Sequence, residues 1–161
     1  MIVEGLNNIK PLAEFVELAE YVAPPETLKV SFLDVGQADS MVIESGGQVM
    51  LLDAGADVNG GQKVLSYLKS QGITNLDYVV ASHGHSDHIG GLPTVIGSTD
   101  ITIGEILVSP KPFSSVPYNA FLTAVQNKGK TITLAQRGDS FVLGAATVEV
   151  LSCLLYTSRC V

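Results

Sequence analysis

The sequence is poor in cysteine, in basic side chains and in long apolar runs. Its two cysteines, Cys153 and Cys160, both lie in the last nine residues. They do not support a disulfide framework, and nothing beside them completes a tetrahedral zinc site. No apolar run approaches the roughly 18 residues of a membrane span, so we expect no membrane segment within this chain. The N-terminus lacks a basic stretch followed by an apolar run, so no signal peptide is visible and the compartment stays open.

Basic residues are outnumbered by acidic ones. Nine Lys and Arg residues stand against 16 Asp and Glu residues, for a formal net charge of −7. This balance argues against a broad basic surface that binds nucleic acid, because contacts between cationic side chains and phosphates supply most of the non-specific affinity for nucleic acid. It does not exclude a nuclease, since bound metal ions can supply positive charge at the site itself.

The length and the apolar content favour one folded domain. A chain of 161 residues with 46% hydrophobic residues can bury a sizeable core. Apolar spacing predicts helices over residues 8–21, 61–71 and 118–127, and a short helix within 88–96. It predicts strands at 28–33, 40–43, 48–52, 76–81, 105–108, 131–134, 140–143 and 147–151. Strands punctuated by helices indicate a layered fold that contains both.

All three histidines of the chain lie in one short segment, residues 83–88, which reads HGHSDH and follows the apolar strand at 76–81. Imidazole and carboxylate groups suit zinc and neighbouring transition ions. In an extended segment, residues two apart point to the same side, so His83 and His85 can converge on one ion. If the chain then turns, Asp87 and His88 face a second position. The alternative is a histidine-rich surface loop, which does not account for the strand before it or for the two glycines at 90–91.

This segment, followed by its two glycines, resembles the signature of the metallo-β-lactamase superfamily. Residues 50–55, MLLDAG, resemble the first motif of that family. Residues 32–40, FLDVGQADS, resemble the opening strand and turn of one branch, the hydrolase domains of bacterial DNA-uptake (competence) channel proteins of the ComEC type. One difference is that Ala38 stands where the branch has glycine, which would strain the turn if it needs a positive φ.

The resemblance implies a fold class, α+β, with two sheets packed face to face and helices outside in an αββα sandwich. It also implies a site with two Zn²⁺ ions per intact domain, or another divalent transition metal. His83 and His85 would bind the first ion, and Asp87 and His88 the second. Asp87 would also accept a proton from the nucleophilic water. Asp53 would support a ligating histidine from behind rather than bind metal itself.

For two further acidic residues, the sequence does not decide between a structural and a functional role. Asp34 and Asp39 flank Gly36, and either they only shape that turn or they contribute to the site.

The family also uses ligands that are not found here. A third histidine, a carboxylate bridging both ions and a final histidine are expected downstream, but no histidine follows His88. We therefore expect residues 28–152 to form the N-terminal half of the domain, to expose core-facing surface, and to be inactive alone. Residues 1–27 are expected to be a helical linker or the end of a preceding segment. Residues 153–161 resemble translated adapter sequence and are predicted to be a non-native tail, with a genuine terminal strand as the alternative.

The function implied by the resemblance is metal-dependent hydrolysis. Metal-bound hydroxide would attack an ester-like bond. The leading substrate is a phosphodiester, for example in DNA. One alternative is a carboxylic or phosphocholine ester cleaved at the same site. Another alternative is a non-catalytic interaction module on the same fold, since a fold does not determine a function.

Overall fold

The computed structural model describes residues 27–111 and 113–151. The expected helix at residues 8–21 and the expected tail at 153–161 therefore lie outside the described residues. Among the residues that are described, no helix is long and apolar enough to cross a membrane.

Six strands form one mixed sheet in the order β1-β2-β3-β4-β5-β6. The strands are β1 (Leu28–Phe32), β2 (Met41–Ser45), β3 (Gln48–Leu52), β4 (Asn75–Ala81), β5 (Thr102–Val108) and β6 (Ile132–Leu134). The first three are antiparallel, and β3 to β6 are parallel. Gly46 and Gly47 make the turn between β2 and β3. Their φ angles of 52° and 81° are values that residues other than glycine rarely adopt. The parallel strands need crossovers, which the helices supply.

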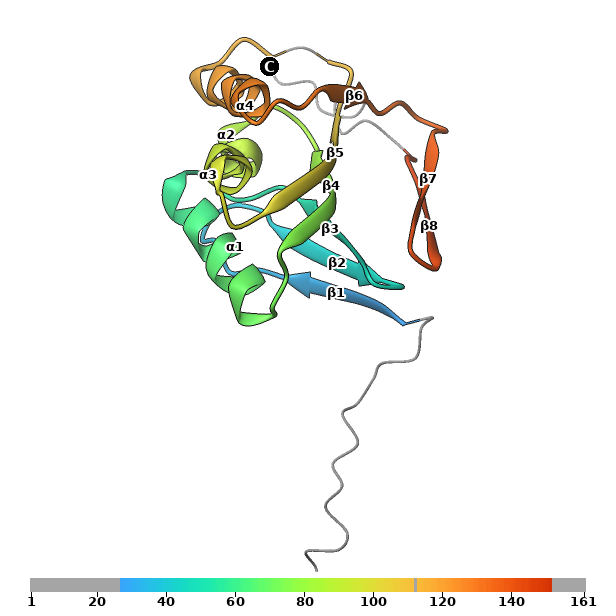
Figure 1. The fold of residues 1–161 in the computed structure, drawn as a ribbon. Helices are drawn as coiled ribbons and strands as arrows, with labels where there is room; N and C mark the ends of the chain where they lie inside the picture. The colour runs from blue at the N-terminus through green and yellow to red at the C-terminus, as the bar shows by residue number, and fades with distance from the viewer. Residues whose placement is uncertain (1–26, 112, 152–161) are drawn as a thin grey trace, which may run out of the picture.

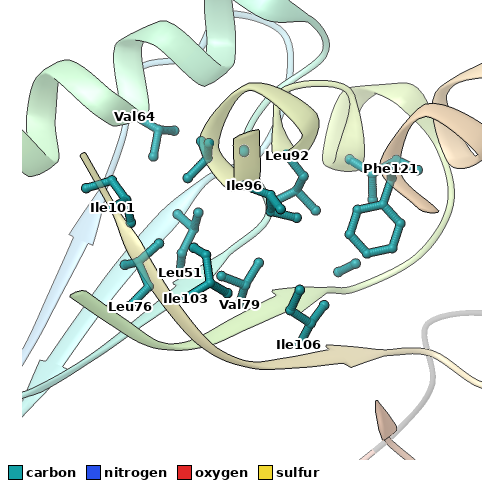
Figure 2. Close-up of a cluster of buried hydrophobic side chains, with 14 of the residues drawn as sticks. Leu51, Val64, Leu76, Val79, Leu92, Ile96, Ile101, Ile103, Ile106 and Phe121 are labelled. Atoms are coloured by element: carbon teal, nitrogen blue, oxygen red, sulfur yellow. The ribbon is translucent and has the colours of Figure 1, made fainter. Parts of the chain in front are cut away.

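The four helices of the described residues lie on one face of this sheet (Figure 1). They are α1 (Val58–Ser70), α2 (Ser86–Ile89), α3 (Leu92–Gly97) and α4 (Val116–Asn127). Figure 2 shows the core between the two layers, where Leu51, Val79 and Ile106 of the sheet are fully buried beneath the helices. The helical side of this core is built by Val64, Leu92, Ile96 and Phe121.

The opposite face of the sheet is only partly covered. A hairpin of β7 (Ser140–Leu143) and β8 (Ala146–Glu149) lies against it, and Phe141 packs on Tyr78 with ring centroids 4.5 Å apart. Between the sheet and this hairpin runs a groove of about 410 Å³ that is lined largely by apolar side chains, among them Met50, Leu52, Val80 and Leu107. At the sheet edge, Phe32 of β1 is 78% exposed. Apolar side chains are therefore exposed on this face, and the expectation that they face the core of a longer domain stays a prediction.

The strands and helices expected from the sequence are present within the described residues, with shifted ends. α1 begins at Val58 because Asp57 caps it, accepting hydrogen bonds from the backbone N–H of Asn59 and Gly60. The helix expected within residues 88–96 is instead two short helices, α2 and α3, separated at Gly90 and Gly91.

Candidate metal centre

Three loops meet at one edge of the sheet. β1, β3 and β4 run in the same direction, so the segments that follow them, residues 33–40, 53–57 and 82–88, start at the same edge. Residues of three separate sequence motifs are thereby brought together.

Backbone hydrogen bonds lock these loops to one another. The N–H of Asp39 donates to the carbonyl of Asp87 (3.1 Å), and the N–H of Ala54 donates to the carbonyl of His88 (2.9 Å). The N–H of Gly55 donates to the carbonyl of Asp39 (3.0 Å). Each loop is therefore held by the other two, which limits how far the motif side chains can move.

Gly90 and Gly91 are needed for space. A Cβ on Gly90 would collide with the carbonyl oxygen of Ala56, and one on Gly91 would collide with that of Ala54. Their φ angles of −60° and −87° are open to any residue. The two glycines thus allow the motif loop and the Asp53 loop to come into contact. The Gly91 N–H donates to the Gly55 carbonyl (3.0 Å) instead of to the Asp87 carbonyl four residues earlier, which separates α2 from α3.

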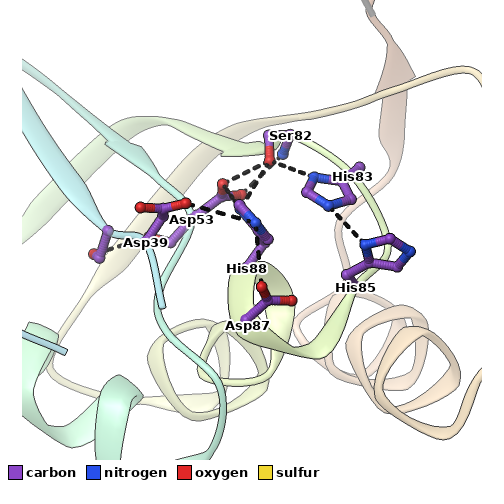
Figure 3. Close-up of polar contacts among 8 residues, drawn as sticks. Asp39, Asp53, Ser82, His83, His85, Asp87 and His88 are labelled. Atoms are coloured by element: carbon purple, nitrogen blue, oxygen red, sulfur yellow. Dashed lines mark hydrogen bonds and ion pairs between the residues drawn. The ribbon is translucent and has the colours of Figure 1, made fainter. Parts of the chain in front are cut away.

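His83 and His85 face one another, as the alternation of an extended segment predicts. His83 Nε2 lies 3.0 Å from His85 Nδ1 (Figure 3). The ring of Phe113, which no pattern in the sequence had singled out, lies 5.6 Å from the His85 ring and packs over Gly84. Burial, followed by the neighbouring His88 and His85, lowers the pKa of His83.

His88 is held from behind by a buried carboxylate. Asp53 is 2% exposed, and its Oδ2 accepts hydrogen bonds from His88 Nδ1 (2.8 Å) and from the Ser82 hydroxyl (2.6 Å). Its Oδ1 accepts from the Ser82 backbone N–H (2.9 Å). The hydrogen bond to Asp53 raises the pKa of His88 above its ordinary value. Because Nδ1 is engaged, Nε2 is the nitrogen that remains to meet a metal ion.

Two carboxylates lie near this free nitrogen. His88 Nε2 is 3.7 Å from Asp87 Oδ2 and 3.6 Å from Asp39 Oδ2. The structure therefore brings together every predicted ligand residue, with Asp53 behind them, and adds Asp39. Asp34 points elsewhere, with its Oδ1 accepting from the Gly36 N–H (3.2 Å), which fits a turn residue.

The turn that carries Asp39 is not strained at Ala38. Among the described non-glycine residues, only Asp53 has a positive φ, of 56°. Gly36 supplies the positive φ of this turn, at 88°. Alanine at position 38 is therefore compatible with the turn.

The donor atoms suit a divalent ion in pairs. With Zn–N bonds of about 2.0 to 2.1 Å in a tetrahedron, two nitrogens lie about 3.3 Å apart. The 3.0 Å between His83 Nε2 and His85 Nδ1 is close to that separation. Within residues 27–111 and 113–151, no group of three or more His, Cys, Asp or Glu side chains is arranged so that it could hold a metal ion. Metal loading therefore requires side-chain rotations, which are open to Asp87 and Asp39 at 53% and 66% side-chain exposure.

Comparison with known proteins gives the class first. Residues 33–141 match the model of the metallo-beta-lactamase superfamily, which is more than half of the chain, so the chain belongs to this superfamily. The fold has counterparts among solved structures. A metallo-beta-lactamase, SMB-1, bound to 2-mercaptoethanesulfonate, aligns with a TM-score of 0.54 at 17% identity, covering 74% of this chain and 49% of that one. A metallo-beta-lactamase-like protein of Thermotoga maritima aligns at 0.52 and 13% identity, covering 73% and 63%. These likenesses show the fold alone.

Curated relatives narrow the class. ComE operon protein 3 of Bacillus subtilis (strain 168) is 30% identical over 142 residues, which is 77% of this chain and 18% of that protein. Competence protein ComA of Neisseria gonorrhoeae is 31% identical over 84 residues, which is 52% of this chain and 12% of that protein. The similarity to the competence branch is thus confirmed, and the chain spans less than a fifth of the length of either relative.

Proposed function

We propose that this chain carries the metal-binding motif of a hydrolase that cleaves a phosphodiester, with DNA as the leading example. The observation that carries the proposal is the arrangement around His88, whose Nδ1 is held by the buried Asp53 while Nε2 faces the carboxylate of Asp87. When bound, Zn²⁺ or another divalent transition ion would lower the pKa of a water molecule and polarise the ester oxygen. A solved diiron protein of this fold, the chemotaxis sensor ODP in a peroxy diiron state, aligns at a TM-score of 0.54 and 19% identity, and is consistent with metal binding here.

The residues have distinct proposed roles. His83 and His85 would hold one ion through Nε2 and Nδ1, the two atoms that face each other. His88 would hold a second ion through Nε2, together with Asp87. The Asp87 carboxylate, at 53% side-chain exposure, is open to solvent and would accept the proton of the attacking water. Asp53 would keep the His88 ring in the orientation and tautomer that a metal ligand needs.

The choice of a phosphodiester depends on the similarity to competence proteins. The net charge of −7 gives no broad attraction for DNA, so the positive charge for a phosphate would come from the metal ions. A carboxylic or phosphocholine ester as substrate, or an interaction module without catalysis, are the outcomes that the assay below separates from this proposal.

The test pairs metal binding with hydrolysis. For the 161-residue chain we expect fewer than two Zn²⁺ ions, held weakly, and no turnover of bis-p-nitrophenyl phosphate above background, because the sequence holds no histidine outside residues 83–88. The decisive assay uses the longest natural protein that contains residues 28–151. There, phosphodiester cleavage should be lost in Asp87→Asn and kept in the matched control Asp34→Asn.

Each contrary result has a defined meaning. Cleavage of a carboxylic ester without cleavage of phosphodiesters would show that the substrate is a carboxylic ester and that the proposed phosphodiester is wrong. A protein that binds no metal and hydrolyses none of these esters would be an interaction module, and the proposed function would be wrong.

A further inference from the structure

We propose that Asp39 is a ligand of the second metal position, which would then be formed by Asp39, Asp87 and His88. This inference rests on the proposed function, because it concerns the same centre. In the proposed function each ion has two protein ligands. Here the second ion has three, Asp39, Asp87 and His88, and the first ion keeps two, His83 and His85.

The distances around His88 Nε2 support a position with three ligands. Asp39 Oδ2 lies 3.6 Å and Asp87 Oδ2 lies 3.7 Å from this nitrogen. Ligands on a tetrahedral zinc ion with bonds of about 2.0 to 2.2 Å lie about 3.3 to 3.6 Å apart. Figure 3 shows Asp39 reaching His88 from the side away from His83 and His85. An ion beside Nε2 would therefore meet both carboxylates once their side chains rotate, since no three such groups of the described residues are arranged to hold an ion as they stand.

The backbone of Asp39 is fixed although its side chain is exposed. Its N–H donates to the carbonyl of Asp87, and its own carbonyl accepts from Gly55. The next residue, Ser40, is 4% exposed and donates its hydroxyl to the Asp53 carbonyl (3.0 Å). Since both neighbouring loops hold this residue, its side chain starts from a fixed backbone position beside His88, and only the side chain has to rotate to reach an ion.

The charge around His88 also needs an explanation. Three carboxylates, those of Asp39, Asp53 and Asp87, surround one imidazole ring. Only Asp53 has hydrogen-bond donors from Ser82 to offset its charge. A divalent cation between Asp39 and Asp87 would offset the repulsion of the other two, and carboxylate with imidazole is a donor set that such ions take.

A position with three protein ligands is complete for a catalytic zinc ion, with the fourth place open to water. The pair of His83 and His85 offers only two. The first ion to bind this chain should therefore occupy the position of Asp39, Asp87 and His88.

The test is equilibrium dialysis of the 161-residue chain against Zn²⁺ with metal analysis, which reads binding rather than turnover. Asp39→Asn keeps the size of the side chain and removes its charge. It should lower the affinity for the first Zn²⁺ ion bound per chain by about tenfold or more. His85→Ala should change the affinity for this first ion little. Asp34→Asn, the same substitution in the same loop, should leave it unchanged, and far-UV circular dichroism checks that each variant folds.

The outcomes separate this inference from the proposed function. If Asp87→Asn weakens zinc binding and Asp39→Asn does not, Asp39 is no ligand and only this inference is wrong. If His85→Ala removes the first equivalent, the order of filling is reversed and the inference is again overturned. If the unaltered chain binds no zinc, the proposed function fails with it. Should Asp39→Asn fold poorly, Asp39→Glu keeps the charge and should retain more affinity than Asp39→Ser.

Discussion

The two halves of the histidine motif are built differently. His88, on α2, has a side chain only 14% exposed, and its ring is fixed by Asp53, whose side chain is 3% exposed. His85, in the loop before α2, is exposed and contacts His83 and the ring of Phe113. One half is therefore organised by the fold before any ligand arrives, while the other is held mainly by the contact between two histidines.

The difference comes from how each residue enters the site. The carbonyl of His88 accepts a hydrogen bond from Ala54, and the next residue, Ile89, is fully buried in the core. His83 and His85 instead lie between the end of β4 and the start of α2. Interactions that tie the two loops together should matter most for the His88 half, which the following experiments examine.

The largest effect is expected from Gly91→Ala. A Cβ at this position would collide with the Ala54 carbonyl oxygen and lie 2.6 Å from the Gly61 nitrogen, so the two loops must separate. We expect a loss of about 3 kcal/mol in the free energy of unfolding, at the upper end for overpacking, measured by urea denaturation. The control is Gly97→Ala in α3, where nothing lies within 4 Å of the new Cβ. Equal stability of the two variants would show that the loops do not need this contact.

Asp53→Asn should have the next largest effect. Asparagine tolerates the positive φ of 56° at this position, but it has one acceptor oxygen where aspartate has two. Its NH2 group must therefore face either the Ser82 backbone N–H or the two donors that meet Oδ2, His88 Nδ1 and the Ser82 hydroxyl. We expect a loss of about 2 kcal/mol in unfolding free energy, as for hydrogen bonds to a buried charged group. Asp139→Asn, at an exposed turn where Oδ2 accepts from Gln136, is the matched control and should cost little. A thermal melt that shifts equally in both variants would argue against a special role for Asp53.

Phe113→Ala examines the open half and should have a smaller effect. Phe113 is partly buried and contacts the rings of His83, His85 and Tyr118. We expect a loss of about 1 kcal/mol, below the value for a fully buried side chain, with the NMR signals of His85 displaced and those of His88 unchanged. The control is Val116→Ala, at an 83% exposed side chain. A displaced His88 signal would mean that the two halves are not independent.

The smallest effect is a difference in titration between the halves. In chelator-treated protein, imidazole NMR signals should show a higher pKa for His88, raised by its hydrogen bond to Asp53, than for His83, lowered by burial. Protonated His88 favours the folded state below the unfolded pKa of about 6.5, and this contribution is lost as pH rises through its folded pKa. Neutral His83 acts in the opposite sense, and its contribution is lost as pH falls through its folded pKa. The reverse order of the two pKa values would contradict the comparison.

Much of this arrangement could be predicted from local patterns. The hairpin turn at Gly46 and Gly47, the strand before the motif and the facing of His83 and His85 follow from turn chemistry and from the alternation of extended chain. Asp53 contacts His88, while its role in supporting a metal ligand stays a prediction. The ligand roles of His83, His85, Asp87 and His88 stay predictions.

Other features could not be read locally. The role of Asp39 was open because its nearness to His88 depends on the loop after β1 folding against the loop after β4. Ser82 adjoins His83 in the sequence, and its position directly after the strand was the one signal that could have indicated it. Phe113 had no such signal, because it lies in an irregular segment after β5. The division between α2 and α3 was missed because it arises from hydrogen bonds to other loops, from the Gly91 N–H to Gly55 and from the Asp39 N–H to Asp87, which the spacing of apolar residues does not record.

By itself, the sequence determined the kinds of donor atoms in the motif, their order along the chain and the strand that leads into them, since each depends on residues close together in the chain. Only the tertiary structure decided that Asp53 lies behind His88 and that Asp39 reaches the same nitrogen as Asp87. It also decided that the His88 ring is fixed by a buried carboxylate while the His85 ring is exposed. These relations join loops that follow three different strands. They depend on the direction of those strands and on the backbone hydrogen bonds between the loops, which no local pattern specifies.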